Sequence, residues 1–353
     1  MSRKVKPVKV GKLRLDGEKI YVQSMLNVPS EDIEGNVRQA VALEKAGCEI
    51  VRVSVPNKAA VSLISAIKEN ISIPLVADIH FDYRLALESA AAGADKIRIN
   101  PGNIGSMDRV KVVADECARR SVPIRIGVNS GSVEKEILAK YGSPTPQALV
   151  ESAMGHVRLL EQCDFDDIVV SIKSSDVPTT IAAYRLAAQT CDYPLHLGVT
   201  EAGTERRGLI KSAVGIGSLL CDGIGETIRV PLTDDPVKEI YAARDILRSI
   251  GKGHGVRLVS CPTCGRTKID LVSLAKRAEE ELSRIDSDIT VAIMGCAVNG
   301  PGEAREADVG VAGGDGCGII FRKGEILRKV DEDKLLEELM AEVKRITADN
   351  IVG

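Results

Sequence analysis

The pattern that decides the fold is clearest in residues 73–100, which read IPLVADIHFDYRLALESAAAGADKIRIN. Ile73–Ile79 is an apolar run rich in strand-favouring residues, so it predicts a buried strand. A longer amphipathic run follows, and Gly93 stands where a glycine commonly ends a helix. Lys96–Asn100 then predicts a second strand. A strand, a helix and a strand in this order favour a parallel sheet with helices packed on it.

The same alternation runs from Glu18 to about Ile250. The strand candidates are Ile20–Ser24, Glu49–Val55, Ile73–Ile79, Lys96–Asn100, Pro123–Val128, Ile168–Ile172, Pro194–Val199 and a weaker one near Asp222–Ile228. Eight strands alternating with eight helices over roughly 230 residues match a (β/α)8 barrel, which typically has about 250 residues. An open doubly wound sheet is the competing architecture, but no GxGxxG follows the first strand. We therefore expect an α/β fold in which residues 1–250 form a TIM-type barrel that binds the substrate.

A second, smaller domain is expected after the barrel. Residues 251–255 read GKGHG, and three glycines in five residues predict a linker. In residues 256–353 the regular alternation of single strands and helices ends, and the pattern predicts an α+β domain. Its strands are expected at Val256–Ser260, Ile289–Gly295, Asp308–Ala312 and Gly318–Arg322, and its helices at Lys268–Ile285 and Glu332–Thr347. A domain of this size can gain much of its stability from a bound metal centre.

Composition and charge exclude some classes of partner. The chain has 47 Lys and Arg against 50 Asp and Glu, a net charge of −3, which argues against a general nucleic-acid binder. Three Phe, six Tyr and no Trp offer few rings for base stacking. No signal peptide and no apolar run long enough to span a bilayer is present. We expect a cytoplasmic protein without a membrane partner, whose nine cysteines are thiols, ligands or nucleophiles rather than disulfides.

Three cysteines stand where metal chemistry is expected. Cys261 and Cys264 follow one strand of the second domain as Cys-Pro-Thr-Cys, and Cys296 follows another. Both loops are poor in side chains, which lets thiolates converge on iron while backbone N–H groups approach the sulfurs. Glu303 ends the second loop and could supply a ligand that is not a thiolate, although a turn glutamate is usually only solvated.

Two other interpretations of these cysteines remain open. A structural zinc site would need a fourth ligand, for which His254 and Cys317 are the candidates. A thioredoxin-like Cys-X-X-Cys pair should open a helix, and it would leave Cys296 without a role.

Polar residues recur at the carboxyl ends of the predicted barrel strands, the face where barrel active sites are built. Four cations at this mouth, in a chain with a negative net charge, predict an anionic ligand, because arginine forms bidentate contacts with phosphate oxygens. The expected substrate-binding residues are Arg52, Arg98, Asn100, Arg125, Asn129, Lys173, Thr227 and Asn299.

Seven segments together resemble the family of 4-hydroxy-3-methylbut-2-enyl diphosphate synthases, enzymes of the methylerythritol phosphate route to isoprenoids. They are VQSM (22–25), VRVS (51–54), ADIH (77–80), KIRINPGN (96–103), RIGVN (125–129), CPTCGR (261–266) and MGCAVNGPGE (294–303). The resemblance covers nearly the whole chain, and the last two segments are the most specific. The short linker implies the compact bacterial form of the family.

The resemblance implies a cofactor, a reaction and partners. The cofactor is a 4Fe–4S cluster with Cys261, Cys264 and Cys296 on three irons and Glu303 on the fourth. The reaction is the two-electron reductive ring opening and dehydroxylation of 2-C-methyl-D-erythritol 2,4-cyclodiphosphate. Ferredoxin or flavodoxin would donate the electrons. A homodimer is implied, in which the cluster domain of one subunit closes over the barrel mouth of the other.

Our hypothesis for the mechanism gives Glu303 the role of a displaceable ligand, so that the substrate can take its place. A proton must reach the leaving hydroxyl, and Glu226 is the first candidate for the donor and His80 the second. Two other functions remain open: a barrel lyase or transferase on a phosphorylated substrate with a metal that only staples the second domain, and a non-enzymatic iron–sulfur sensor of a diphosphate. Glu303 argues against both, since neither needs a labile fourth ligand.

Overall fold

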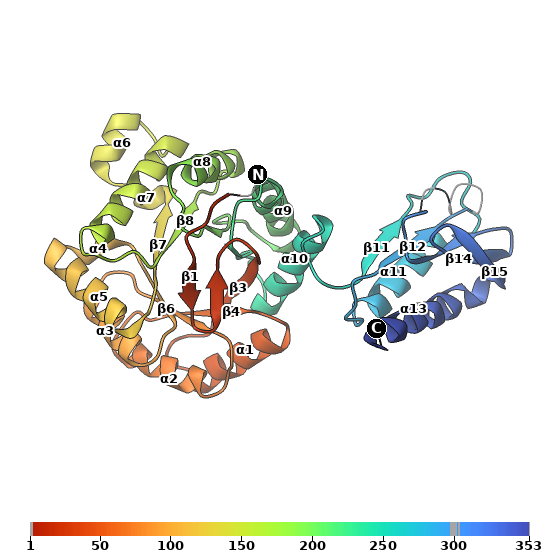
Figure 1. Ribbon diagram of the computed structural model, residues 1–353, viewed down its shortest axis with the longest axis horizontal. Helices are drawn as coiled ribbons and strands as arrows, with labels where there is room; N and C mark the ends of the chain where they lie inside the picture. The colour runs from red at the N-terminus through yellow and green to blue at the C-terminus, as the bar shows by residue number, and fades with distance from the viewer. Residues whose placement is uncertain (1–2, 297–301, 303, 353) are drawn as a thin grey trace. The chain divides into compact units, whose positions relative to one another are not determined.

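Figure 1 shows the computed structural model of the chain, which describes residues 3–296, 302 and 304–352. The chain divides into two compact units, Met1–Ile246 and Leu247–Gly353. Each unit has its own sheet and its own hydrophobic core.

The first unit is a barrel of eight parallel strands, as predicted (Figure 1). The strand order is β8-β7-β6-β5-β4-β3-β10-β9, and a parallel bridge from Val170 to Leu195 joins the two ends. The strands are β3 (Tyr21–Met25), β4 (Ile50–Ser54), β5 (Leu75–Asp78), β6 (Lys96–Ile99), β7 (Ile124–Asn129), β8 (Ile168–Lys173), β9 (His196–Leu197) and β10 (Thr227–Ile228). The eighth strand of the barrel is short, in keeping with its weak sequence signal.

Helices surround the barrel (Figure 1). They are α1 (Ile33–Lys45), η1 (Ala59–Val61), α2 (Ser62–Lys68), α3 (Tyr83–Ala91), α4 (Pro101–Ile104), α5 (Met107–Arg120), η2 (Ser130–Ser132), α6 (Lys135–Tyr141), α7 (Pro146–Glu161), α8 (Val177–Thr190), α9 (Glu205–Cys221) and α10 (Pro236–Ser249). Aspartates Asp32, Asp82 and Asp176 cap α1, α3 and α8 by accepting backbone N–H bonds. Strand ends and helix starts are therefore defined locally, which places the loops at the barrel mouth.

An N-terminal hairpin closes the opposite end of the barrel. Its strands are β1 (Val8–Val10) and β2 (Leu13–Leu15), and our sequence analysis did not predict it. Val8, Val10 and Leu15 are fully buried and pack against Val169, near the start of β8. The barrel interior is thus sealed at the amino ends of its strands and open at their carboxyl ends.

The second unit is a mixed sheet with two helices on one face. The elements are β11 (Arg257–Ser260), α11 (Leu271–Leu282), β12 (Thr290–Met294), β13 (Val309–Gly313), β14 (Cys317–Arg322), β15 (Glu325–Asp331), η3 (Glu332–Lys334) and α13 (Leu335–Val352). The strands are ordered from β11 to β15. The first three are parallel to one another, and β14 is antiparallel to both of its neighbours, β13 and β15. Leu274 and Leu339, from the two helices, pack against Val291 and Val311. The strand β15 was missed by the sequence analysis.

Two further features bear on the sequence analysis. The expected linker, residues 251–255, belongs to the second unit, where Asp288 accepts bonds from the Gly255 N–H and from His254, and Arg248 donates to the His254 carbonyl. Within the described residues, no helix has both the length and the apolar character needed to cross a bilayer.

Candidate functional site

The carboxyl ends of the barrel strands surround a cavity of about 160 Å³. Five cations and one carboxylate contribute to its lining, so its charge is strongly positive. The lining residues are Arg52, Arg98, Arg125, Gly127, Asn129, Ser171, Lys173, Val199, Thr200, Glu201, Arg229 and Pro231. The structure thus brings together the predicted residues Arg52, Arg98, Arg125, Asn129 and Lys173.

A buried carboxylate orients two of the arginines. Asp78, at the end of β5, accepts from Arg52 Nη2 at 2.5 Å and from Arg98 Nη1 at 3.0 Å, and only 1% of Asp78 is exposed. Burial alone would raise the pKa of Asp78, but the charges of the two guanidinium groups hold it well below its ordinary value. Asp78 is therefore ionised, and it holds the two cations at the cavity wall.

Arg125 has no such partner. It is 1% exposed, and its Nε and Nη1 atoms find no hydrogen-bond acceptor in the described part of the chain. Burial and the like charges of Arg52 and Arg98 lower its pKa, yet arginine does not lose its proton in proteins. Lys173 lies on the same wall, where burial and the neighbouring arginines lower its pKa. A buried charge without a partner is costly, so this wall is built to receive an anion.

Arg229 is a site residue that the sequence analysis missed. It follows β10 directly, lines the cavity, and forms two bonds to Glu239 of α10, from Nη2 to Oε1 at 2.9 Å and from Nε to Oε2 at 3.1 Å. Ser24 Oγ also donates to Glu239, which is buried. A signal was available in the sequence, because Arg229 directly follows the weak eighth strand.

Two groups at the mouth could deliver a proton. Glu201 lines the cavity and has φ of 52°, a left-handed conformation that costs a residue other than glycine free energy. His80 follows β5, and its Nε2 lies 3.5 Å from Asp78 Oδ2, with 49% of the side chain exposed. A strained backbone conformation at a residue that lines a cavity is typical of functional sites.

The positions of two predicted residues at the mouth were wrong. Glu226 precedes β10 and lies at the amino end of the barrel, where it accepts from the Leu195 N–H and lies 3.5 Å from Arg3 Nη1. Thr227 is fully buried within the barrel and pairs with His196 Nδ1 at 2.9 Å. The error arose because the eighth strand was expected near Asp222–Ile228, whereas it begins only at Thr227.

Asn100, which was predicted to bind the substrate, has a structural contact at the end of β6. It is buried at the end of β6, and its side chain caps α4 by accepting from the Gly102 N–H at 3.2 Å. It does not belong to the cavity lining. Its carbonyl oxygen is therefore already used to shape the loop beside the site.

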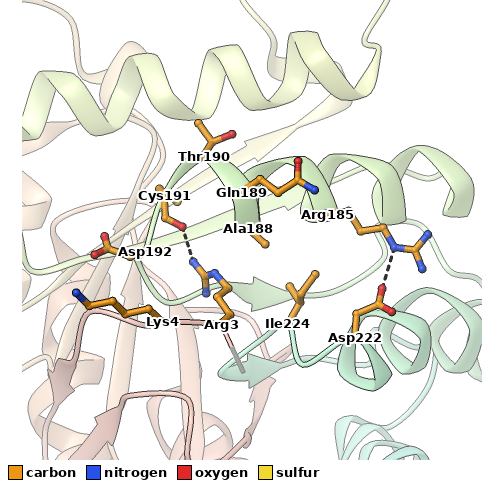
Figure 2. Close-up of a pocket in the computed structure, with 10 residues that line it drawn as sticks. All are labelled: Arg3, Lys4, Arg185, Ala188, Gln189, Thr190, Cys191, Asp192, Asp222 and Ile224. Carbon is orange, nitrogen blue, oxygen red and sulfur yellow. Dashed lines mark hydrogen bonds and ion pairs between the residues drawn. The ribbon is translucent and has the colours of Figure 1, made fainter. Parts of the chain in front are cut away.

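A larger cavity, of about 760 Å³, lies at the amino end of the barrel (Figure 2). Two of its three cations are already engaged: Arg3 donates to the carbonyls of Cys191 and Tyr193, and Arg185 pairs with Asp222 at 2.8 Å. In barrels this face serves stability, whereas catalysis occurs at the other face. The smaller cavity is therefore the better candidate for the active site.

The cysteines lie at one edge of the second unit's sheet. Cys261 follows β11, and Cys296 comes two residues after β12, its parallel neighbour. The Gly295 N–H donates to Cys261 Sγ at 3.1 Å, and the Lys268 N–H donates to the Gly295 carbonyl, so the two loops are joined. Hydrogen bonds from the Arg266 backbone and side chain lower the pKa of Cys264. These are the contacts that favour thiolates and tune iron–sulfur centres.

The donor set fits an iron–sulfur cluster, because Cys261, Cys264 and Cys296 supply the thiol groups that bind iron as thiolates. Within the described residues, no three His, Cys, Asp or Glu side chains are grouped closely enough to hold a metal ion. Two predicted residues, Glu303 and Asn299, lie outside the described residues. His254, the candidate zinc ligand, pairs instead with Asp286 and Asp288.

Comparisons with known proteins match both units. A family described as "GcpE TIM-barrel domain" matches residues 5–244, and "GcpE protein C-terminal domain" matches residues 257–345. The chain is 57% identical over 349 residues to the 4-hydroxy-3-methylbut-2-en-1-yl diphosphate synthase (flavodoxin) of Clostridium perfringens, covering 98% of this chain and 100% of that protein. A protein of the same name from Caldanaerobacter subterraneus is 56% identical over 351 residues and covers 99% of each chain.

Solved structures support the barrel architecture alone. The 3-dehydroquinate dehydratase of Geobacillus kaustophilus superposes with a TM-score of 0.51 at 12% identity, over 70% of this chain and 99% of that one. The dihydropteroate synthase of Stenotrophomonas maltophilia also gives 0.51 at 12% identity, over 69% of this chain and 98% of that one. At such low identity, the likeness carries no information on activity.

Proposed function

This chain belongs to the GcpE family, and from that premise we propose which residues bind the substrate, hold the cofactor and donate the proton in the family's reaction. Its function is that of its relatives, the 4-hydroxy-3-methylbut-2-en-1-yl diphosphate synthases. The enzyme opens the ring of 2-C-methyl-D-erythritol 2,4-cyclodiphosphate reductively and removes a hydroxyl group, with two electrons supplied from outside. The comparisons give no support to a metal-stapled lyase or to a non-enzymatic sensor.

The barrel cavity binds the diphosphate in this proposal. The observation that carries it is the set of buried cations at one wall, of which Arg125 has no acceptor for two of its nitrogens within the described residues. Asp78 and Glu239 hold Arg52, Arg98 and Arg229 in place, so these groups need little reorganisation when charge develops on the departing diphosphate.

Cys261, Cys264 and Cys296 would hold three irons of a 4Fe–4S cluster, and Glu303 would hold the fourth. When bound, such a cluster supplies electrons one at a time and a Lewis-acidic iron. The Gly295 N–H, already bonded to Cys261 Sγ, would stabilise the negative charge on that sulfur.

Glu201 replaces Glu226 as the first candidate for the proton donor. The leaving hydroxyl departs as water and must gain a proton, and Glu201 is the carboxylate of the cavity lining. His80 stays the second candidate, since it stands at the mouth beside Asp78. Glu226 is sealed at the other end of the barrel, where burial raises its pKa, and cannot reach the cavity.

The partners follow from the reaction and the relatives' names. We propose flavodoxin as the electron donor, with ferredoxin as the alternative, and a homodimer as the working assembly. None of the nine cysteines is in a disulfide, so the three proposed ligands are available to iron, and we propose a cytoplasmic location, where reducing conditions keep them so.

Anaerobic purification tests the proposal directly. Iron and acid-labile sulfide should be present in equal amounts, and the protein should convert the cyclic diphosphate when given reduced flavodoxin. Sedimentation of the same material should show a dimer. A preparation without iron, or one that contains the cluster but never consumes the cyclic diphosphate, would contradict the proposal.

A further inference from the structure

A polar layer lies inside the barrel beneath the cations of the cavity. Lys96 and Arg98 lie two residues apart on β6, so both point to the same side of the sheet, and Arg98 lines the cavity. Lys96 therefore lies one layer deeper. It is fully buried, and its Nζ atom has no hydrogen-bond partner among the described residues.

In the part of the chain that the structure describes, no neighbour offers Lys96 a negative charge. The charges that act on it are those of Arg125 on β7 and Arg52 on β4, both positive. His196 on β9 belongs to the same layer; its Nδ1 pairs with Thr227, and its Nε2 finds no partner within the described residues. Asp78, the buried carboxylate of this region, is already held by Arg52 and Arg98.

Lys96 is thus in the position where a lysine loses its proton most easily. An ammonium group here would be removed from water, would lack an acceptor and would face two guanidinium groups. Arginine keeps its proton under such conditions, so the lysine amine is the group that loses its proton.

We propose that Lys96 is uncharged in the substrate-free barrel and accepts one proton from solvent when the cyclic diphosphate binds in the cavity above it. The diphosphate would neutralise Arg125, whose Nε and Nη1 atoms are unpartnered in the described structure, and so remove the repulsion that keeps Lys96 neutral. Lys96 is then a positioning residue that acts through Arg125. The inference rests on the proposed function, because it requires this ligand in this cavity.

The electrostatics agree with this assignment. Burial, followed by the charges of Arg125 and Arg52, lowers the pKa of Lys96 well below its ordinary value. Burial and the same cations also lower the pKa of Lys173, but that side chain lines the cavity and is half-buried, so water can reach it. His196 is the remaining rival, since burial and the surrounding cations lower its pKa too.

Isothermal titration calorimetry can measure the number of protons that the enzyme takes up when the ligand binds. The cluster-loaded enzyme is titrated with the cyclic diphosphate, without an electron donor, in buffers of equal pH but different enthalpies of ionisation. The dependence of the binding enthalpy on the buffer enthalpy should show uptake of about one proton per chain. Because the free state is the deprotonated one, affinity should fall about tenfold per pH unit as the pH rises above the pKa of Lys96 in the free enzyme.

Three variants identify the acceptor. Lys96→Met and Lys96→Arg should both bind without proton uptake, the first because no amine remains and the second because the guanidinium is already charged. His196→Gln is the matched control from the same layer and should retain the uptake. If His196→Gln abolished the uptake while Lys96→Met kept it, the inference would be wrong.

Proton uptake by the wild-type protein tests the inference even if a variant fails to fold. If the cyclic diphosphate bound without proton uptake at every pH from about 6 to about 9, this inference would be overturned and the proposed function would stand. The absence of any binding would overturn the proposed function, and the inference with it.

Discussion

The two units build their sites in different ways. In the barrel, the site side chains stand on the strands or directly after them, and buried carboxylates such as Asp78 hold two of the cations before any ligand binds. In the second unit, the cysteines stand in loops at the edge of an open sheet, and Cys264 is exposed. The comparison teaches that a fold can preorganise a site for an anion by itself, whereas a cluster site depends on the metal to complete its geometry.

Cys296→Ser should have the largest effect on the metal-dependent site. Losing one thiolate leaves too few ligands, so we expect the cluster and all turnover to be lost. Iron and acid-labile sulfide analysis of anaerobically purified protein measures this. Cys317→Ser, at the start of β14 in the same unit, is the matched control and should keep its iron. An unchanged iron content in Cys296→Ser would show that the ligand assignment is wrong.

Glu201→Gln should lower kcat by about 100- to 10,000-fold while KM changes little, because general acid catalysis is lost and the cations remain. Steady-state kinetics with reduced flavodoxin measures both constants. Glu226→Gln provides the contrast: it lies at the amino end of the barrel and should leave kcat unchanged. Equal losses in the two variants would remove Glu201 from the mechanism.

Asp78→Asn should test the preorganisation of the barrel site. It leaves two guanidinium groups without their carboxylate, so the free energy of unfolding should fall by about 3–5 kcal/mol. Urea unfolding followed by circular dichroism measures the change.

The pH dependence gives a second measure of the same pair. The folded-state pKa of Asp78 is lowered, so its stabilisation is fully present above the unfolded pKa of about 3.9 and is lost as the pH falls towards the folded value. The difference between wild type and Asp78→Asn should therefore shrink below about pH 4. A difference that stayed constant on acidification would contradict the ion-pair account.

Arg229→Gln should have a smaller effect, on substrate binding. Loss of a charge-assisted contact is worth about 1.5–3 kcal/mol, so KM should rise about 10- to 100-fold. Arg185→Gln removes a cation from the other end of the barrel, where its pair with Asp222 is exposed, and should leave KM unchanged. If both substitutions raised KM alike, the effect would be one of overall charge rather than of the site.

Much of the barrel site was predictable because apolar runs are local features. Arg52, Arg98, Arg125 and Lys173 were found because each lies in or directly after a strong apolar run, and all four line the cavity. Glu226 failed because the eighth strand has a weak signal, and an early start for that strand moved a residue to the wrong end of the barrel.

The N-terminal hairpin could not be found in the same way. Its strands are three residues each, and they are stable only because Val8, Val10 and Leu15 pack against Val169, which lies far along the chain. The pairing of Arg229 with Glu239 of α10 depends on a tertiary contact of the same kind. Such long-range contacts leave no periodic pattern in the sequence.

The sequence by itself determined the alternating strands and helices of the barrel and the positions of the three cysteines, and it predicted an anionic ligand for the cations at the mouth. Each of these depends on short-range periodicity or on residue chemistry. Only the tertiary structure decided which charges are paired and which are not, because burial and neighbouring charges arise when distant strands meet. Lys96 is the clearest case: β6 alone shows a lysine in a strand, and the closed barrel places it, fully buried, near two arginines.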